Sequence, residues 1–248
     1  MQRDKASDGT GKEALRVELP GIEGHLWLDP EGAVVRHTQP ARPGDSGVTE
    51  AWVADLHLGK GTAFRRAGVA IPRGGSEHDI KRLRLLVHRH GVQRLWILGD
   101  LIHAGTSWSD TLDELMSEWR TALPDLEVRL LLGNHDRRGG TPPASWGFQV
   151  IDTPVSQGGI QMMHEPEWSP EVPAFAGHLH PVVRLPEGRG RRLQMPCFWW
   201  HRNVLVLPAF GTFTGGAAIT PHRDDRVFAV GPDQVVEIPV TTVHSRRS

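Results

Sequence analysis

The sequence predicts an α/β protein with two β-sheets, and three observations support this fold class. Between residues 49 and 136, apolar strand patterns alternate with helix patterns, which is typical of parallel strands joined by right-handed crossovers. From residue 148 onward, short strand patterns are separated by turn residues, and this favours a second, largely antiparallel sheet. The chain has 248 residues, which is enough for one sizeable core, and no long linker divides it.

The N-terminal part combines a polar segment with strand patterns. Residues 1–15 are polar, and we expect a disordered tail there, ahead of a single domain over residues 16–248. In residues 23–37, apolar runs lie on either side of the turn sequence DPEG, which indicates a β-hairpin. The loop ARPGDSG follows, and then the strand pattern TEAWVADLHLGKG, which ends in polar residues.

Two amphipathic helices are predicted in the middle of the chain, over residues 76–91 and 109–124. Ser76 is expected to cap the first helix, with Asp79 three residues later, and Gly91 to end it. Apolar residues recur on one face of each helix, at Ile80, Leu83, Leu86 and Val87 in the first and at Leu112, Leu115, Met116, Trp119 and Leu123 in the second.

Further strand patterns complete the predicted sheets. VQRLWILGD and LEVRLLLGNHD flank the second helix as buried strands. The second half contains FQVIDTP, GIQMMHEP, VPAFAGHLHPVVRLP, RRLQMPCFWWH, NVLVLPAFG and RVFAVGPDQVVEIPV, and the charged sequence EGRGRR indicates a hairpin turn.

Composition and charge exclude several classes of protein. The formal net charge of −1 is not that of a bulk polyanion binder, although a basic surface could be local. No run approaches the roughly 20 apolar residues that cross a bilayer, and the N-terminus lacks the apolar core of a signal peptide. The single cysteine, Cys197, excludes an intramolecular disulfide framework. We therefore expect a cytoplasmic protein that does not associate with membranes.

Polar residues follow the predicted strands in five places. These clusters are Asp55-Leu56-His57, Gly99-Asp100-Leu101-Ile102-His103, Gly133-Asn134-His135-Asp136, Met163-His164-Glu165 and Gly177-His178-Leu179-His180. The first three clusters end consecutive parallel strands, and the carboxyl ends of such strands share one edge of a sheet, where ligands bind. We therefore expect them to converge, with their glycines in tight turns.

The clusters together offer carboxylates, an amide and several imidazoles, a mixture that suits manganese, iron or zinc better than calcium or magnesium. This chemistry fits two divalent cations about 3.5–4 Å apart, with an acidified water between them as the nucleophile for a phosphoester. A carboxylate such as Asp100 can bridge such a pair. His135 follows the ligand candidate Asn134 and could donate a proton to the leaving oxygen. Asp136 could then hold the His135 imidazole in place.

The sequences DLH, GDLIH, GNHD, MHEP and GHLH, in this order, resemble the signature of the calcineurin-like metallophosphoesterases. The resemblance spans residues 55–180 and implies a four-layer α/β/β/α sandwich of two mixed β-sheets. It implies that one metal ion is held by Asp55, His57 and His180, the other by Asn134, His164 and His178, and that Asp100 bridges them.

The resemblance also implies roles for the residues around the metal ions. His135 would be the catalytic histidine that faces the phosphate and the leaving group. His103 stands where many members have an aspartate, and we expect it, like Asp136, beside the metal ligands rather than among them. Manganese is the favoured metal, with iron or zinc as alternatives.

Basic residues beside these clusters favour DNA as the substrate. Lys60, Arg65 and Arg66 follow the first cluster, and Arg137 and Arg138 follow the third. Such side chains can contact phosphates beyond the scissile one, as a nucleic-acid backbone requires. With NVLVLPAFGTFTGG, they resemble the bacterial ligase-associated DNA-damage-response endonucleases, which are encoded beside a DNA ligase and a helicase. This resemblance implies an endonuclease that acts on single-stranded DNA in DNA repair.

Other interpretations stay open at this point. The enzyme could be a small-molecule phosphodiesterase, or a nucleotide or sugar-nucleotide pyrophosphatase of the same superfamily, although residues 136–160 contain no amphipathic lid. A non-catalytic scaffold is a further alternative, but every ligand position is filled. Trp108 and Trp146 follow the second and third clusters and could stack unpaired bases, with core packing as the alternative.

Overall fold

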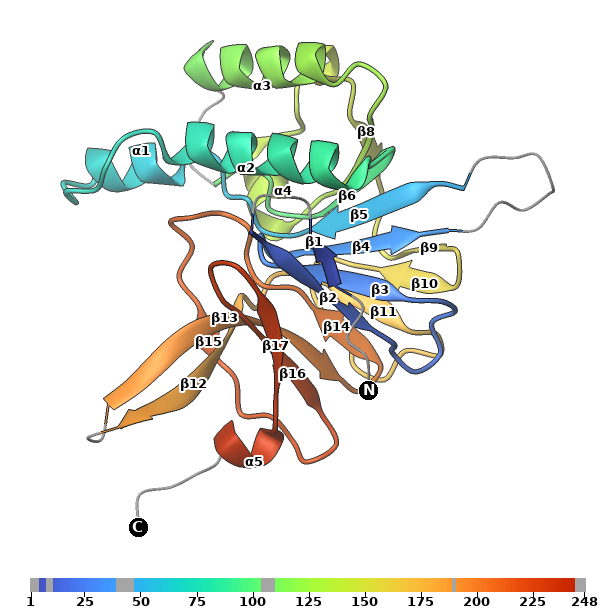
Figure 1. Ribbon diagram of the computed structural model, residues 1–248. Coiled ribbons are helices and arrows are strands. Elements are labelled where there is room, and N and C mark those ends of the chain that lie inside the picture. Colours follow the sequence, from blue (N-terminus) through green and yellow to red (C-terminus); the bar gives the residue numbers. More distant parts are fainter. Residues whose placement is uncertain (1–4, 8–10, 39–46, 104–109, 189–190, 244–248) are drawn as a thin grey trace.

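Two mixed β-sheets pack face to face, and helices cover the outer face of the first sheet (Figure 1). This arrangement is seen in a computed structural model that describes residues 5–7, 11–38, 47–103, 110–188 and 191–243. The predicted fold class, with two mixed sheets and flanking helices, is confirmed.

The first sheet has eight strands, which lie in the order of the sequence. They are β1 (Lys5–Ser7), β2 (Glu13–Val17), β3 (Leu26–Asp29), β4 (Ala33–His37), β5 (Thr49–Val53), β6 (Arg94–Leu98), β7 (Glu127–Leu131) and β8 (Gln149–Ile151). Neighbours from β1 to β5 pair antiparallel, and neighbours from β5 to β8 pair parallel. The predicted hairpin is β3 and β4.

Two features of the first sheet differ from expectation. FQVIDTP, which we assigned to the second sheet, forms β8 and pairs in parallel with β7, because its apolar run is too short to identify its partner. β1 and β2 also place strands inside the segment that we expected to be a disordered tail, and residues 1–4 and 8–10 of that segment lie outside the described residues.

The second sheet has nine strands. They are β9 (Val155–Gln157), β10 (Ile160–Met162), β11 (Ala174–Ala176), β12 (Pro181–Gly188), β13 (Arg191–His201), β14 (Val204–Val206), β15 (Ala217–Ala218), β16 (Arg226–Val230) and β17 (Val235–Ile238). Most pairs are antiparallel, but β10 with β11, β11 with β14 and β12 with β15 are parallel. EGRGRR joins β12 to β13, and residues 189 and 190 within it lie outside the described part.

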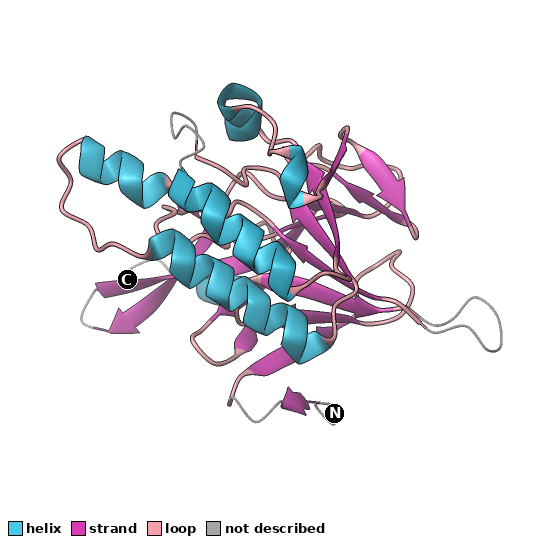
Figure 2. Cartoon of the chain, turned by 90° about the horizontal axis from the view of Figure 1, so that it is seen from above, coloured by secondary structure: helices cyan, strands magenta, loops and turns pink. Residues whose placement is uncertain are grey.

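Two long helices lie side by side over the first sheet (Figure 2). They are α2 (Gly75–His90) and α3 (Asp110–Ala122), and the shorter elements are α1 (Lys60–Arg66), α4 (Asn134–Gly139), the 3-10 helix η1 (Ala144–Trp146) and α5 (Val240–Val243). Ser76 does not cap α2, because the helix begins one residue earlier and Ser76 Oγ accepts a hydrogen bond from the backbone of Gly59 at 2.9 Å. Among the described residues, no helix is long and apolar enough to cross a membrane.

The core has two main layers. One lies between the helices and the first sheet and contains Leu83, Leu86 and Met116. The other lies between the sheets, where the rings of Trp52 and Phe175 meet edge to face with centroids 5.2 Å apart. In the described chain, the outer face of the second sheet carries α5 and the segment of residues 165–172, rather than long helices.

Candidate metal centre

The carboxyl ends of three parallel strands bring the first ligand candidates together. Asp55 and His57 follow β5, Asp100 follows β6 and Asn134 follows β7. The backbone N–H of Asp55 donates to the carbonyl of Gly99 at 3.1 Å, and that of His57 donates to the carbonyl of Asp100 at 2.9 Å. These bonds extend the sheet pairing beyond the strand ends and align the two loops.

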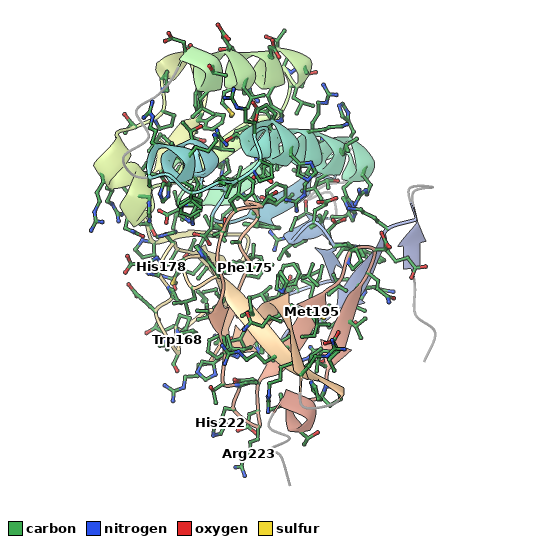
Figure 3. The ribbon with its side chains drawn as sticks, turned by 90° about the vertical axis from the view of Figure 1, so that its left-hand side faces the viewer. Trp168, Phe175, His178, Met195, His222 and Arg223 are labelled. Carbon is green, nitrogen blue, oxygen red and sulfur yellow. The ribbon has the colours of Figure 1, made fainter. Side chains whose placement is uncertain are left out.

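The second sheet contributes three histidines at the same edge. His164 follows β10, and His178 and His180 follow β11. The backbone N–H of His178 donates to Asp55 Oδ2 at 2.8 Å, so a loop of the second sheet is bonded to a carboxylate of the first. Figure 3 shows His178 at the end of the second sheet that faces the helical layer.

Five of the seven predicted metal ligands have a left-handed backbone conformation. The φ angles are +56° at Asp55, +47° at His57, +51° at Asp100, +69° at His178 and +46° at His180. Residues with a side chain seldom adopt this region, which costs of order 1–3 kcal/mol, and a cluster of such residues is typical of functional sites.

Asp55, His57 and His180 form one group, in which the ligand atoms lie within 4.8 Å of one another. His180 Nε2 lies 3.3 Å from Asp55 Oδ1 and 3.3 Å from His57 Nε2. His180 Nδ1 donates to the carbonyl of Gly215 at 3.1 Å. In a neutral imidazole, that bond leaves the Nε2 lone pair directed at the group.

Asp100, His164 and His178 form a second group, which Asn134 joins. His164 Nε2 lies 3.2 Å from His178 Nδ1 and 3.0 Å from Asn134 Oδ1. His164 Nδ1 donates to the carbonyl of Leu98 at 2.8 Å, so its Nε2 lone pair also faces the other ligand atoms.

Asp100 lies between the two groups. Its Oδ2 is 3.7 Å from His57 Nε2, and its Oδ1 is 3.5 Å from His164 Nε2. Asp55 Oδ1 is buried and accepts no hydrogen bond from the described residues. The lone pairs of these carboxylate oxygens and imidazole nitrogens face one another, and they repel unless a cation lies between them. The donor set therefore fits two divalent cations with nitrogen and oxygen ligands and one bridging carboxylate.

The imidazole of His57 is held in the form that binds metal. Burial lowers the pKa of His57 to about 2, and the positive charge of Lys60 acts in the same direction. Because only a neutral imidazole has a lone pair for a metal, His57 is ready to bind one at neutral pH.

A comparison with protein families matches the region that contains these ligands. The sequence model of the calcineurin-like phosphoesterase family matches residues 51–188, which include all five polar clusters. The chain belongs to this family. Members use a dinuclear centre of divalent cations, and the two groups described above are the candidate ligands of this phosphoesterase.

The phosphoesterase is also similar to a solved structure, the nuclease MPE of Pseudomonas putida. The two chains share 36% sequence identity with a TM-score of 0.74, and the match covers 91% of this chain and 100% of that chain. A comparison with curated proteins gives no match.

His135 and His103 gather around His57 of the first group of the phosphoesterase, and one ring nitrogen of each of the three lies within 4.8 Å of the others. The ring centroid of His135 is 4.8 Å from that of His57, and His103 stacks on His135 at 5.0 Å. His135 Nε2 is 4.0 Å from Asp100 Oδ2, and 25% of the His135 side chain is exposed. Burial lowers the pKa of His135 and lowers that of His103 to about 4. His135 thus lies next to the candidate ligands and is partly open to solvent.

Asp136 shapes the ligand loops rather than holding the imidazole of His135. Its carboxylate accepts hydrogen bonds from the backbone N–H groups of Leu101 at 3.3 Å, Ile102 at 3.0 Å and Gly133 at 3.0 Å. Burial raises the pKa of Asp136 to about 6. Our prediction for Asp136 is corrected accordingly, because its hydrogen bonds in the described part of the chain connect the loop after β6 to the loop after β7.

Two glycines are required by close approach of ligand side chains. At Gly99, where φ is +84°, an added Cβ would lie 2.2 Å from His164 Nδ1. At Gly133, an added Cβ would lie 2.1 Å from Asp100 Oδ1, although φ there is an ordinary −80°. Gly133 is therefore needed for space and not, as we expected, for a tight turn.

The glycine-rich sequence GTFTGG supports the first ligand loop, a role that the sequence analysis missed. The backbone N–H of Gly211 donates to the carbonyl of Asp55 at 3.1 Å. On the other side, the N–H of Thr212 donates to Asp79 Oδ2 of α2 at 3.1 Å. The segment thus connects α2 to the ligand loop, and its Gly215 carbonyl orients a ligand histidine as described above.

The basic residues that we predicted to bind substrate lie on two short helices. They are Lys60, Arg65 and Arg66 on α1, and Arg137 and Arg138 on α4. Burial lowers the pKa of Lys60, while the carboxylates of the centre oppose that shift. Arg66, Arg137 and Arg138 are exposed and form no salt bridge with any described residue, so their charges are available to an anion.

Trp146 is not available for base stacking. It is fully buried under the helices, and its Nε1 donates to Asp113 Oδ1 at 2.6 Å. The other candidate, Trp108, lies outside the described residues. Trp168, which the sequence analysis did not single out, is 37% exposed on the second-sheet side (Figure 3). Its ring packs against that of Trp199, with centroids 5.5 Å apart.

Proposed function

We propose that this phosphoesterase is a manganese-dependent endonuclease that cleaves single-stranded DNA in DNA repair. The observation that carries the proposal is the pair of ligand groups with Asp100 between them, beside arginines that have no salt-bridge partner in the described chain. A dinuclear centre suits phosphoester hydrolysis, and unpaired arginines suit a polyanionic backbone. Similarity to the Pseudomonas putida nuclease supports nucleic acid as the substrate.

The ligand groups define the proposed roles. Asp55, His57 and His180 would hold one cation, Asn134, His164 and His178 would hold the other, and the carboxylate of Asp100 would serve both. When bound, the two cations supply an activated water and neutralise charge on the phosphate. His135 contacts the phosphate and donates a hydrogen bond or proton to the leaving oxygen. His103 positions His135 by stacking on its ring.

The cellular setting belongs to the same proposal. The resemblance to endonucleases encoded beside a DNA ligase and a helicase supports functional association with such enzymes. The single, buried cysteine, Cys197, suits the reducing cytoplasm.

Hydrolysis of four substrates by the manganese-loaded protein tests this proposal. They are covalently closed single-stranded DNA, linear duplex DNA, bis-p-nitrophenyl phosphate and p-nitrophenyl phosphate. We expect cleavage of the single-stranded circle, which requires an endonuclease because it has no ends, and turnover of the diester above that of the monoester. Chelation should abolish both activities, and manganese should restore them better than zinc or iron.

The His135→Ala protein, purified in the same way, controls for contaminating nuclease. Strong turnover of the nitrophenyl esters with intact DNA circles would replace the proposal with a small-molecule phosphodiesterase. No hydrolysis of any substrate by metal-loaded protein would favour a non-catalytic scaffold.

A further inference from the structure

A cavity rich in arginine opens between α1, the beginning of α2 and α3. It has a volume of about 460 Å³, and its lining includes Arg65, Arg66 and Arg73. Glu77 is the single acidic residue among its described lining residues. We call this feature the arginine cavity, and its charge is net positive.

The three guanidinium groups are prepared for an anion in different ways. Arg65 is held in place, because its Nη1 donates to the carbonyl of Pro72 at 3.0 Å and its Nη2 donates to Thr62 Oγ1 at 2.9 Å. Arg66 and Arg73 are exposed, and neither forms a salt bridge with a described residue. The cavity thus combines one fixed guanidinium with two uncompensated charges, which suits phosphate recognition.

The arginine cavity adjoins the metal centre. It shares Gly61 and Ser76 with a small recess that is lined by His57 and Lys60. The backbone N–H of Lys60 donates to the carbonyl of His57 at 3.1 Å, so α1 begins directly at the ligand loop. Because α1 has seven residues, it carries its arginines no more than about 10 Å from Lys60 along the helix axis.

Acidic residues follow one ligand candidate of the second group. The segment after the ligand His164 exposes Glu165, Glu167 and Glu171, none of which forms a salt bridge with a described residue. An extended polyanion bound at the metal centre is therefore repelled by this segment and attracted toward α1.

From these observations, we propose that the arginine cavity binds a second phosphate of the substrate strand, separate from the phosphate at the metal centre. Lys60 lies on the path between the two phosphates. The ligand class is a single-stranded nucleic acid with at least two phosphodiesters, so this inference rests on the proposed nuclease function. It assigns to Arg73, which lies outside every polar cluster, a role in binding substrate.

Kinetics of the double variant Arg66→Gln/Arg73→Gln test the inference. Both side chains are exposed, so we expect the variant to fold. The substrates are a single-stranded oligothymidylate and bis-p-nitrophenyl phosphate, which has only one phosphate. We expect KM for the oligothymidylate to rise about tenfold or more. The rise in KM for the one-phosphate ester should be at least five times smaller. The salt dependence of kcat/KM for the oligothymidylate should fall by about 0.7 in log–log slope for each lost phosphate contact.

The matched control is Arg191→Gln/Arg223→Gln, which removes the same charge from two exposed positions of the second-sheet side. Arg191 begins β13, and Arg223 lies before β16, far from the helical layer (Figure 3). The inference is overturned if this control raises KM as much, if the cavity variant weakens both substrates equally, or if it changes neither. Absence of oligothymidylate cleavage by the unmodified enzyme, with the ester still hydrolysed, would instead refute the nuclease proposal. The unmodified enzyme and the variants therefore decide the two questions separately.

Discussion

The two sheets supply different chemistry to the candidate metal centre. Loops of the first sheet contribute the carboxylates of Asp55 and Asp100, the amide of Asn134 and one imidazole, whereas the second sheet contributes imidazoles only. Each ligand group takes members from both sheets. Neither sheet therefore holds a complete site, and the centre depends on how the sheets pack.

The charged residues next to the ligand loops also differ between the two sheets. Close to the candidate metal centre, α1 and α4 carry Lys60, Arg65, Arg66, Arg137 and Arg138, and Arg73 lies in the loop before α2. The segment after β10 exposes Glu165, Glu167 and Glu171. The basic residues thus follow the loops that supply the carboxylate ligand candidates, and the acidic residues follow a loop that supplies a histidine. This difference implies a direction for the substrate strand, toward α1 and α4.

The largest effect is expected at the residue that both ligand groups share. Asp100→Asn should lower kcat/KM by about a thousandfold or more, because it removes a charge that faces both cation positions. His178→Asn, which affects only the second group, should lower kcat/KM by a smaller factor. Metal content and cleavage of single-stranded DNA, measured on the same samples, check this. Equal losses of kcat/KM in the two variants would show that the first-sheet carboxylate contributes no more to the centre than a second-sheet histidine.

Asp136→Ala tests the internal bonding of the first-sheet loops. It leaves three buried backbone N–H groups without their acceptor, so we expect the free energy of unfolding to fall by about 3 kcal/mol and the melting temperature by roughly 10 °C. Thermal unfolding measures the change, and Asp125→Ala, at an exposed position, is the control. A normal melting temperature with lost activity would return Asp136 to the role of orienting His135.

His135→Ala separates proton donation from metal binding. Loss of a proton donor typically costs about a hundredfold or more in rate. The loss should be larger for DNA than for bis-p-nitrophenyl phosphate, because p-nitrophenolate leaves readily without a proton. Steady-state kinetics on both substrates check this, with metal content as the control. Equal losses would indicate that His135 binds the phosphate without donating a proton.

The smallest effect is expected from the acidic segment after β10. Glu167→Lys should tighten binding of a labelled oligothymidylate about threefold at low salt, and the gain should vanish at high salt because exposed charges are screened. Fluorescence anisotropy in the cleavage-deficient His135→Ala protein measures this. Asp233→Lys makes the same charge change at the turn between β16 and β17 and should have less effect. If both variants bind the oligothymidylate equally tightly, the net charge of the protein guides the strand, and the position of the acidic residues does not.

Part of the site could be predicted because it depends on local patterns. Apolar runs that end in Asp55, Asp100 and Asn134 identified the strand ends, and parallel pairing brings such ends to one edge. Helices α2 and α3 were evident from their spacing of apolar residues. Ligation by the seven residues stays a prediction, but the structure brings all of them into the two groups.

Other features could not be read from local patterns. β8 has three residues, which are too few to reveal that it pairs with β7. Helices α1 and α4 are also short and are stabilised by tertiary contacts more than by propensity. Trp146 follows a ligand cluster in sequence, yet its side chain points into the core.

By itself, the sequence determined which residue types stand at the strand ends, and hence the chemistry of the centre, since those depend on neighbours along the chain. Only the tertiary structure decided that Asp136 bonds to the backbone of two loops, that Gly133 makes room for Asp100, and that Arg73 joins the arginines of α1. Each of these depends on distances between side chains and backbone groups that packing brings together, and no periodicity in the sequence records such distances.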